Sequence, residues 1–162
     1  MAAVARIVAP VSLRIALALP FFKSGLTKWD GFMSLAPTTS FLFAQEFKLH
    51  IVGHVYDLPA SDLLALATAT AEIILPILLI VGLATRFSAL SLLGMTGVIQ
   101  LIVPDGWANF HLPWATMAIA LIAIGPGRAS LDHLLRKRFK SQPAARVMAP
   151  RTASTNEKPA ER

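Results

Sequence analysis

Cysteine is absent from the 162 residues of the chain. Disulfide bonds, thiolate metal sites and thiol redox chemistry by the chain itself are therefore excluded. A chain of this length suffices for one domain. Any redox role would have to rely on a bound molecule or on a partner protein.

Charged residues are also scarce. They make up 15% of the chain, against roughly 25% in an ordinary soluble domain, while hydrophobic residues make up 55% and the mean hydropathy is +0.61. A small soluble domain needs a charged coat over its surface, and too few charges are present to make one. A soluble enzyme and a disordered chain are both disfavoured, and the composition predicts an integral membrane protein.

Four long apolar segments organise the chain, each near the roughly 20 residues that a helix needs to cross the hydrocarbon core. None shows the period-2 alternation of a membrane barrel strand. The sequence predicts an all-α, integral membrane four-helix bundle with helices at about 6–29, 62–85, 87–104 and 107–125. Residues 1–135 would form this domain and residues 136–162 a basic, disordered tail. A cleaved signal peptide in place of the first helix is disfavoured, because Arg14 interrupts its apolar run.

The distribution of charge predicts the direction of the helices. Residues 1–127 carry six basic and six acidic groups, so the net charge of +6 comes from residues 128–162. Positive charge is retained on the cytoplasmic side of a membrane. We therefore expect both termini in the cytoplasm, together with the short turn that contains Gly82, Thr85 and Arg86. This retention explains a basic tail after an apolar body better than nucleic-acid binding does.

Two ionisable residues are expected at membrane depth, Arg14 in the first predicted helix and Glu72 in the second. A charge at membrane depth costs several kcal/mol unless it is paired. The two helices run in opposite directions and the two residues differ in depth by about one turn. We therefore expect an Arg14–Glu72 ion pair that faces the bundle interior. Such a pair either fixes helix register or handles protons or a ligand, and both roles remain open.

Small residues mark surfaces where helices can approach closely in lipid. The outer half of the second helix is rich in them, with Ala65, Thr68 and Ala69 among others. Gly94 and Gly97 are expected to do the same in the third helix.

Three polar residues are expected near the outer ends of helices. Lys28 lies near the outer end of the first helix, Gln100 near the outer end of the third, and His111 near the outer start of the fourth. They could converge on one cavity open to the outer face, where a histidine and an amide would suit a quinone carbonyl or a proton relay. The alternative is that Gln100 and His111 bond each other, or the backbone, at a helix end.

The loop over residues 23–62 holds a third candidate. Glu46, His50 and His54 recur every four residues, which would place them on one helical face, and two histidines at this spacing can bind a transition metal. Gly53 and the β-branched residues around it weaken the helix prediction. An interfacial amphipathic segment is favoured instead. The aromatic side chains expected in its head-group zone are those of Phe41, Phe43 and Phe47.

Several short motifs together resemble a known family. They are Arg14, Phe-Lys-Ser-Gly-Leu-Thr-Lys-Trp at 22–29, Ala-Glu-Ile-Ile-Leu-Pro at 71–76, Gly-Leu-Ala-Thr-Arg at 82–86 and Gly-Pro-Gly at 125–127. Over about residues 6–135 this combination is similar to the DoxX family of small, mostly bacterial, four-helix membrane proteins. The family's characteristic polar positions would fall on Arg14, Gly25, Lys28, Glu72 and Arg86.

The resemblance implies an architecture more firmly than a chemistry. The family takes its name from a terminal quinol oxidase subunit and a related thiosulfate–quinone oxidoreductase, and other members are linked to oxidative-stress complexes. The resemblance implies that the chain is an accessory inner-membrane subunit of such a redox complex, with quinone as the candidate cofactor. A redox enzyme or a second copy is the candidate partner beside the lipid bilayer. Other hypotheses are a scaffold without a small-molecule site, and a transporter or metal-handling protein that uses His50, His54 and His111.

Overall fold

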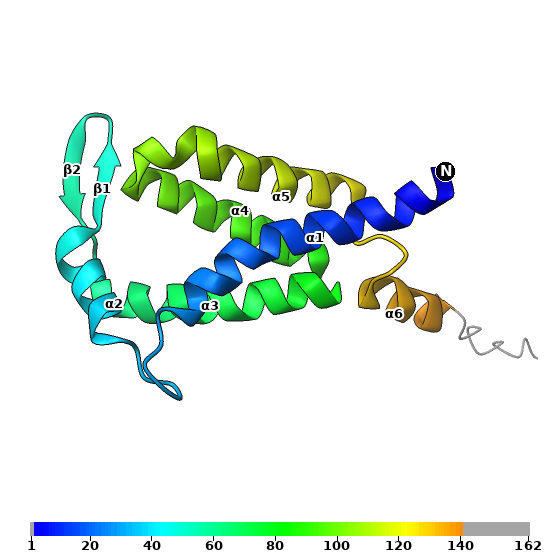
Figure 1. Cartoon of the computed structure of the whole chain (residues 1–162), viewed down its shortest axis with the longest axis horizontal. Coiled ribbons are helices and arrows are strands. Elements are labelled where there is room, and N and C mark those ends of the chain that lie inside the picture. Colours follow the sequence, from blue (N-terminus) through cyan, green and yellow to red (C-terminus); the bar gives the residue numbers. More distant parts are fainter. Residues whose placement is uncertain (1, 141–162) are drawn as a thin grey trace, which may run out of the picture.

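Residues 2–140 are described by the computed structural model, in which four membrane-spanning segments form an up-and-down bundle (Figure 1). The first three are α1 (Ala2–Leu26), α3 (Ser61–Val81) and α4 (Thr85–Ile102). The fourth joins a 3₁₀ turn (Pro104–Gly106) and a π-helical turn (Trp107–His111) to α5 (Leu112–Ile124). All four are long and apolar enough to cross a membrane. The predicted all-α, four-helix membrane fold is confirmed.

The core of the bundle lies where α1 and α4 each pack against both α3 and α5. Its large buried side chains are Leu17, Phe21, Leu79, Leu92 and Leu121. Many other large apolar side chains are exposed on the outward faces of the helices. Apolar outward faces are what a bundle surrounded by lipid requires, because lipid tails are as apolar as these side chains.

Glycine allows close helix approach in α1 rather than in α4. A Cβ on Gly25 of α1 would lie 2.9 Å from the carbonyl carbon of Glu72 in α3. Gly94 and Gly97 of α4 are exposed, and a Cβ on either would meet nothing within 4 Å. The expectation that these two glycines let helices approach is therefore wrong, because they lie on the outward face of α4.

The turn between α3 and α4 is held by Asp132, which follows the fourth membrane-spanning segment. Gly82 ends α3 with φ of 76°, a conformation that favours glycine. The first N–H groups of a helix have no partner within the helix. At the start of α4, Ala84 N–H and Thr85 N–H donate to the two carboxylate oxygens of Asp132 at 2.8 and 2.9 Å.

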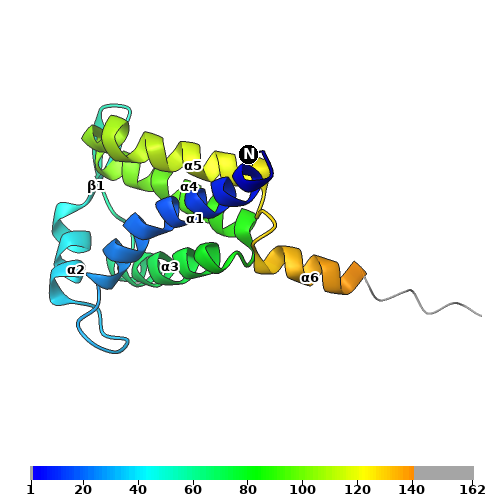
Figure 2. The same ribbon diagram turned by 45° about the vertical axis from the view of Figure 1, so that its right-hand side comes forward.

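Helix α6 (Leu131–Lys140) carries this aspartate and lies at the same end of the bundle as the N-terminus (Figures 1 and 2). Its N-cap is Ser130, whose Oγ accepts the N–H of His133 at 3.2 Å. Residues 136–140 were expected to begin a disordered tail, but they form the second half of α6. The rest of the predicted tail lies outside the described residues. We call this end of the bundle the α6 end.

Residues 27–60 cover the opposite end of the bundle, which we call the hairpin end (Figure 1). They include α2 (Pro37–Phe41), a π-helical turn (Leu42–Glu46) and the antiparallel strands β1 (Lys48–Ile51) and β2 (His54–Asp57). Val52 and Gly53 form the hairpin turn with φ of 48° and 79°. Two positive φ angles are typical of the type I′ turn of a two-residue hairpin.

Candidate functional site

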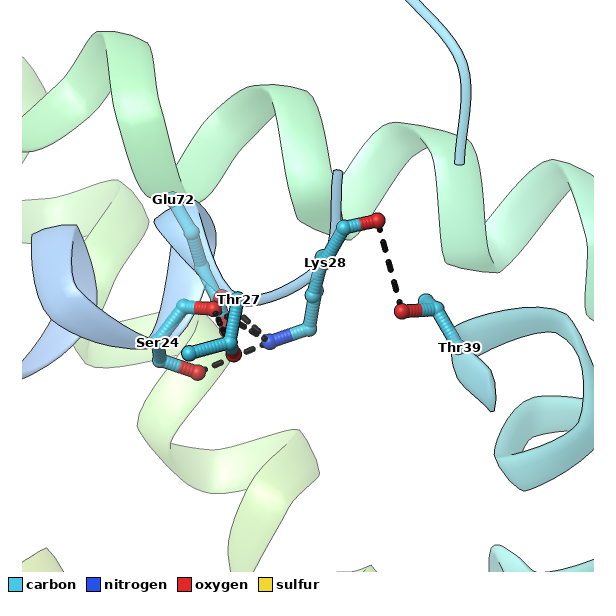
Figure 3. A network of polar contacts seen from close by, with 5 residues as sticks. All are labelled: Ser24, Thr27, Lys28, Thr39 and Glu72. Atoms are coloured by element: carbon cyan, nitrogen blue, oxygen red, sulfur yellow. Dashed lines mark hydrogen bonds and ion pairs between the residues drawn. The ribbon is translucent and has the colours of Figure 1, made fainter. Parts of the chain in front are cut away.

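Lys28, two residues after the end of α1, forms an ion pair with Glu72 in the middle of α3 (Figure 3). Lys28 Nζ lies 2.5 Å from Glu72 Oε2 and also donates to Ser24 Oγ at 2.8 Å. The Glu72 side chain is 4% exposed and that of Lys28 is 15% exposed. Burial makes each charge depend on the other, because an unpaired charge at membrane depth is costly.

The backbone around the pair explains how Lys28 reaches α3. Gly25 lets α1 touch the backbone of Glu72. Lys28 follows three residues later and also faces α3. The carbonyl oxygen of Lys28 accepts the N–H of Ala36 at 2.9 Å and the Oγ1 hydroxyl of Thr39 at 3.3 Å (Figure 3). Ala36, just before α2, and Thr39, within α2, therefore hold the backbone of Lys28 in place.

The expected Arg14–Glu72 ion pair is wrong, although both residues are buried, at 2% and 3% exposed. Arg14 lies against Gly82, ten residues beyond Glu72 and therefore about 15 Å along α3. Its Nη2 donates to the carbonyl oxygen of Ala129 at 2.7 Å. The prediction placed the two helices at the same level, whereas the Gly25–Glu72 contact shows that α1 is displaced along α3 toward the α6 end.

A cavity of about 240 Å³ opens beside the ion pair. Its polar lining is Ser24, Lys28, Thr68 and Glu72, and its apolar lining includes Phe43, Phe47, Met95, Ile99 and Trp114. Within residues 2–140, Glu72 Oε1 accepts no hydrogen bond, and the Ser24 hydroxyl accepts one from Lys28 but donates none. The cavity therefore offers one carboxylate acceptor and one hydroxyl donor inside a largely apolar wall.

Gln100 and His111 do not join Lys28 in this cavity. His111 Nδ1 lies 2.6 Å from Gln100 Oε1, while Gln100 Nε2 donates to the carbonyl oxygen of Pro104 at 3.1 Å. Since the amide oxygen is the acceptor, His111 carries its proton on Nδ1. The Trp114 ring packs at 5.5 Å from the His111 ring and also lines the cavity. The predicted convergence is wrong, and the alternative of a mutual bond at a helix end is what the structure shows.

Glu46, His50 and His54 do not share a helical face. His50 in β1 pairs with Val55, and His54 in β2 pairs with Ile51. Because side chains alternate along a strand, the two histidines point to opposite faces of the hairpin. Within residues 2–140 no group of three histidine, cysteine or acidic side chains is placed to hold a metal ion. The metal hypothesis required these three residues to share a helical face, and that prediction is wrong.

The predicted turn residues lie together at the α6 end. Gly82 ends α3, Thr85 is buried at the start of α4, and Arg86 is exposed beside it. Partial burial alone would raise the pKa of Asp132. The N–H donors of Thr85 and Ala84 and the charge of Arg136 outweigh this effect and hold that pKa below its ordinary value.

Ser24 is a part of the site that the sequence interpretation missed. It lies four residues before Lys28, and this i, i+4 spacing is the signal that could have found it. Phe43 and Phe47 were expected among lipid head groups. Instead their rings pack against each other at 5.1 Å and line the cavity, because the segment after α2 folds back over α3.

Comparison with known proteins assigns the chain to a family. The DoxX family model matches residues 9–105, which include Arg14, Lys28, Glu72 and Arg86. The chain belongs to the DoxX family. An uncharacterized protein of Haemophilus influenzae (strain ATCC 51907 / DSM 11121 / KW20 / Rd) is 30% identical over 148 residues, covering 80% of this chain and 85% of that protein. No solved structure matches the chain.

Membership of the DoxX family and the four apolar helices agree in making the chain a multi-pass membrane protein in contact with lipid. The DoxX match ends at the start of the fourth span. Its range contains both partners of the buried ion pair, Lys28 and Glu72.

Proposed function

We propose that the chain is an accessory membrane subunit of a quinone-linked or oxidative-stress redox complex, and that the cavity beside Lys28 and Glu72 holds a quinone ring. The observation that carries the proposal is the combination of a largely apolar cavity with a buried ion pair in its wall. DoxX membership supports the redox context. The bound quinone would carry the electrons, since the chain has no cysteine.

The lining matches the chemistry of a quinone. Quinone carbonyl oxygens accept hydrogen bonds, which the Ser24 hydroxyl can donate. Hydroxyl groups of the reduced ring donate hydrogen bonds, which Glu72 Oε1 can accept. Pockets for drug-sized molecules measure roughly 300–1,000 Å³. A cavity of about 240 Å³ therefore suits the ring alone, and the isoprenoid tail would extend into lipid.

We place the chain in a bacterial inner membrane with both termini in the cytoplasm. The support is the concentration of positive charge in residues 128–162. The cavity, which lies toward the hairpin end, would then face the periplasmic half of the bilayer. Alkaline phosphatase fused to the C-terminus should be inactive, because that enzyme needs an oxidising compartment for its disulfides. Active phosphatase would reverse this topology.

Quinone binding can be measured with purified full-length protein. Trp114 lines the cavity, so a short-tailed ubiquinone bound there should quench tryptophan fluorescence. Thr68→Phe fills the cavity and is expected to weaken binding at least tenfold. Thr70→Phe is the matched control, because Thr70 is exposed on the same helix and does not line the cavity.

The outcomes separate the proposals. Protein that neither retains quinone on purification nor binds the added ubiquinone would contradict the quinone site and leave the scaffold hypothesis in its place. Equal binding by the Thr68→Phe and Thr70→Phe variants would show that quinone binds elsewhere on the bundle.

A further inference from the structure

A second cavity, of about 420 Å³, lies at the α6 end of the bundle, between the first turn of α4, Pro126 and α6. Arg86 of α4 and Arg136 of α6 line it. Its apolar lining includes Phe87, Leu135 and Phe139. The opposite end of the bundle carries the hairpin (Figures 1 and 2), and neither Lys28 nor Glu72 lines this second cavity.

The charges in this cavity leave it positive. Arg86 makes no hydrogen bond or ion pair with any residue in 2–140. Arg136 attracts the Asp132 carboxylate, which is the acidic group in the lining. Both oxygens of that carboxylate already accept N–H groups of α4, from Ala84 and Thr85. Two guanidinium groups therefore face one carboxylate that is already engaged.

Apolar side chains continue outward from the arginines. Phe87 is 65% exposed and Phe139 is 73% exposed. Further exposed apolar residues of α6 are Leu131, Leu134 and Leu135. With Phe139 they recur at the spacing of one helical face, which is the pattern of a helix that lies at a membrane interface. The cavity thus combines a cationic centre with apolar surroundings.

We propose that this cavity binds an anionic phospholipid, with the phosphate between Arg86 and Arg136 and the acyl chains along Phe87 and Phe139. A guanidinium group presents paired donors that match a phosphate. The cavity lies at the end of a membrane-spanning helix, which is where lipid head groups gather. A free anion would use the arginines but leave the aromatic side chains uncovered. The bound lipid would join α4 to α6 and hold α6 at the membrane surface.

Native mass spectrometry of the purified full-length protein tests the proposal with phosphatidylglycerol and phosphatidylcholine as probes. We expect the protein to retain phosphatidylglycerol in preference to phosphatidylcholine. The double variant R86Q/R136Q should bind phosphatidylglycerol at least about tenfold more weakly, since it loses hydrogen bonds between charged groups that each contribute roughly tenfold or more. Both arginines are exposed, so the variant should keep its helical circular dichroism.

The matched control is R128Q/R138Q, which removes the same charge from exposed neighbours that do not line the cavity. We expect its affinity for phosphatidylglycerol to stay close to that of the unmodified protein, because neither arginine lines the cavity. Equal loss in the two double variants would mean diffuse attraction of charge and would overturn the site. Inorganic phosphate that displaces phosphatidylglycerol at equal concentration would show a free-anion site and would overturn the lipid as occupant.

Discussion

Lys28 Nζ lies 2.5 Å from Glu72 Oε2 at the level where Gly25 brings α1 against α3. The contact joins the end of one membrane helix to the middle of another. It also forms the polar wall of the cavity at the hairpin end. Helix packing and the candidate chemistry of the site therefore depend on the same pair of residues.

A double-mutant cycle should detect this pairing. We expect Glu72→Leu alone to cost about 3 kcal/mol of unfolding free energy, because it leaves a buried ammonium group without a partner. Adding Lys28→Met should recover part of that loss. Unfolding in detergent micelles, followed by circular dichroism, measures both. The control cycle combines Glu72→Leu with Arg14→Leu and should be additive, since Arg14 lies beside Gly82 instead. Coupling to Arg14 rather than to Lys28 would contradict the observed register.

Alanine substitutions of two helix glycines should act in opposite directions. Gly25→Ala would place a Cβ 2.9 Å from the carbonyl carbon of Glu72, so α1 and α3 must separate. We expect a loss of about 1–3 kcal/mol from this overpacking. Gly94→Ala meets nothing within 4 Å and should gain up to about 1 kcal/mol from helix propensity. Thermal unfolding of both variants measures the difference, and loss of stability in both would show that α4 uses Gly94 in packing.

The sequence could predict the helices but not their relative height. Length, hydropathy and the charged tail each depend on local composition, and all four spans were found. Which residue faces Glu72 depends instead on where α1 slides along α3, and contacts at Gly25 and Gly82 decide that. The prediction placed the two helices at the same level and so paired Glu72 with Arg14, whereas its partner is Lys28. Local spacing misled it again at His50 and His54, because the turn at Val52 and Gly53 makes a hairpin there.

Gly82→Ala should cost more than its backbone conformation alone requires. A residue other than glycine in the left-handed region costs about 1–2 kcal/mol. The added Cβ would also overlap Arg14 Nη1 and lie 2.7 Å from the Cβ of Ser130, so we expect about 2–5 kcal/mol in total. Gly53→Ala isolates the backbone cost, because φ is 79° and nothing lies within 4 Å. Equal shifts in Tm for the two variants would show that Arg14 does not press against Gly82.

The stability contributed by Asp132 should depend on pH. Its carboxylate caps α4, and its pKa is lowered in the folded protein, so its contribution is complete above the ordinary pKa of about 3.9 and is lost as pH falls through the lower, folded pKa. We expect Asp132→Asn to cost about 1–2 kcal/mol at pH 7, like the loss of a helix cap. The gap in Tm to the unmodified protein should stay constant from about pH 7 to 5 and shrink below about pH 4.

Asp30→Asn, which removes an exposed carboxylate without a hydrogen bond in residues 2–140, should show little gap throughout. A gap for Asp132→Asn that grew as the pH fell would mean that the aspartate is not held in its charged form by α4.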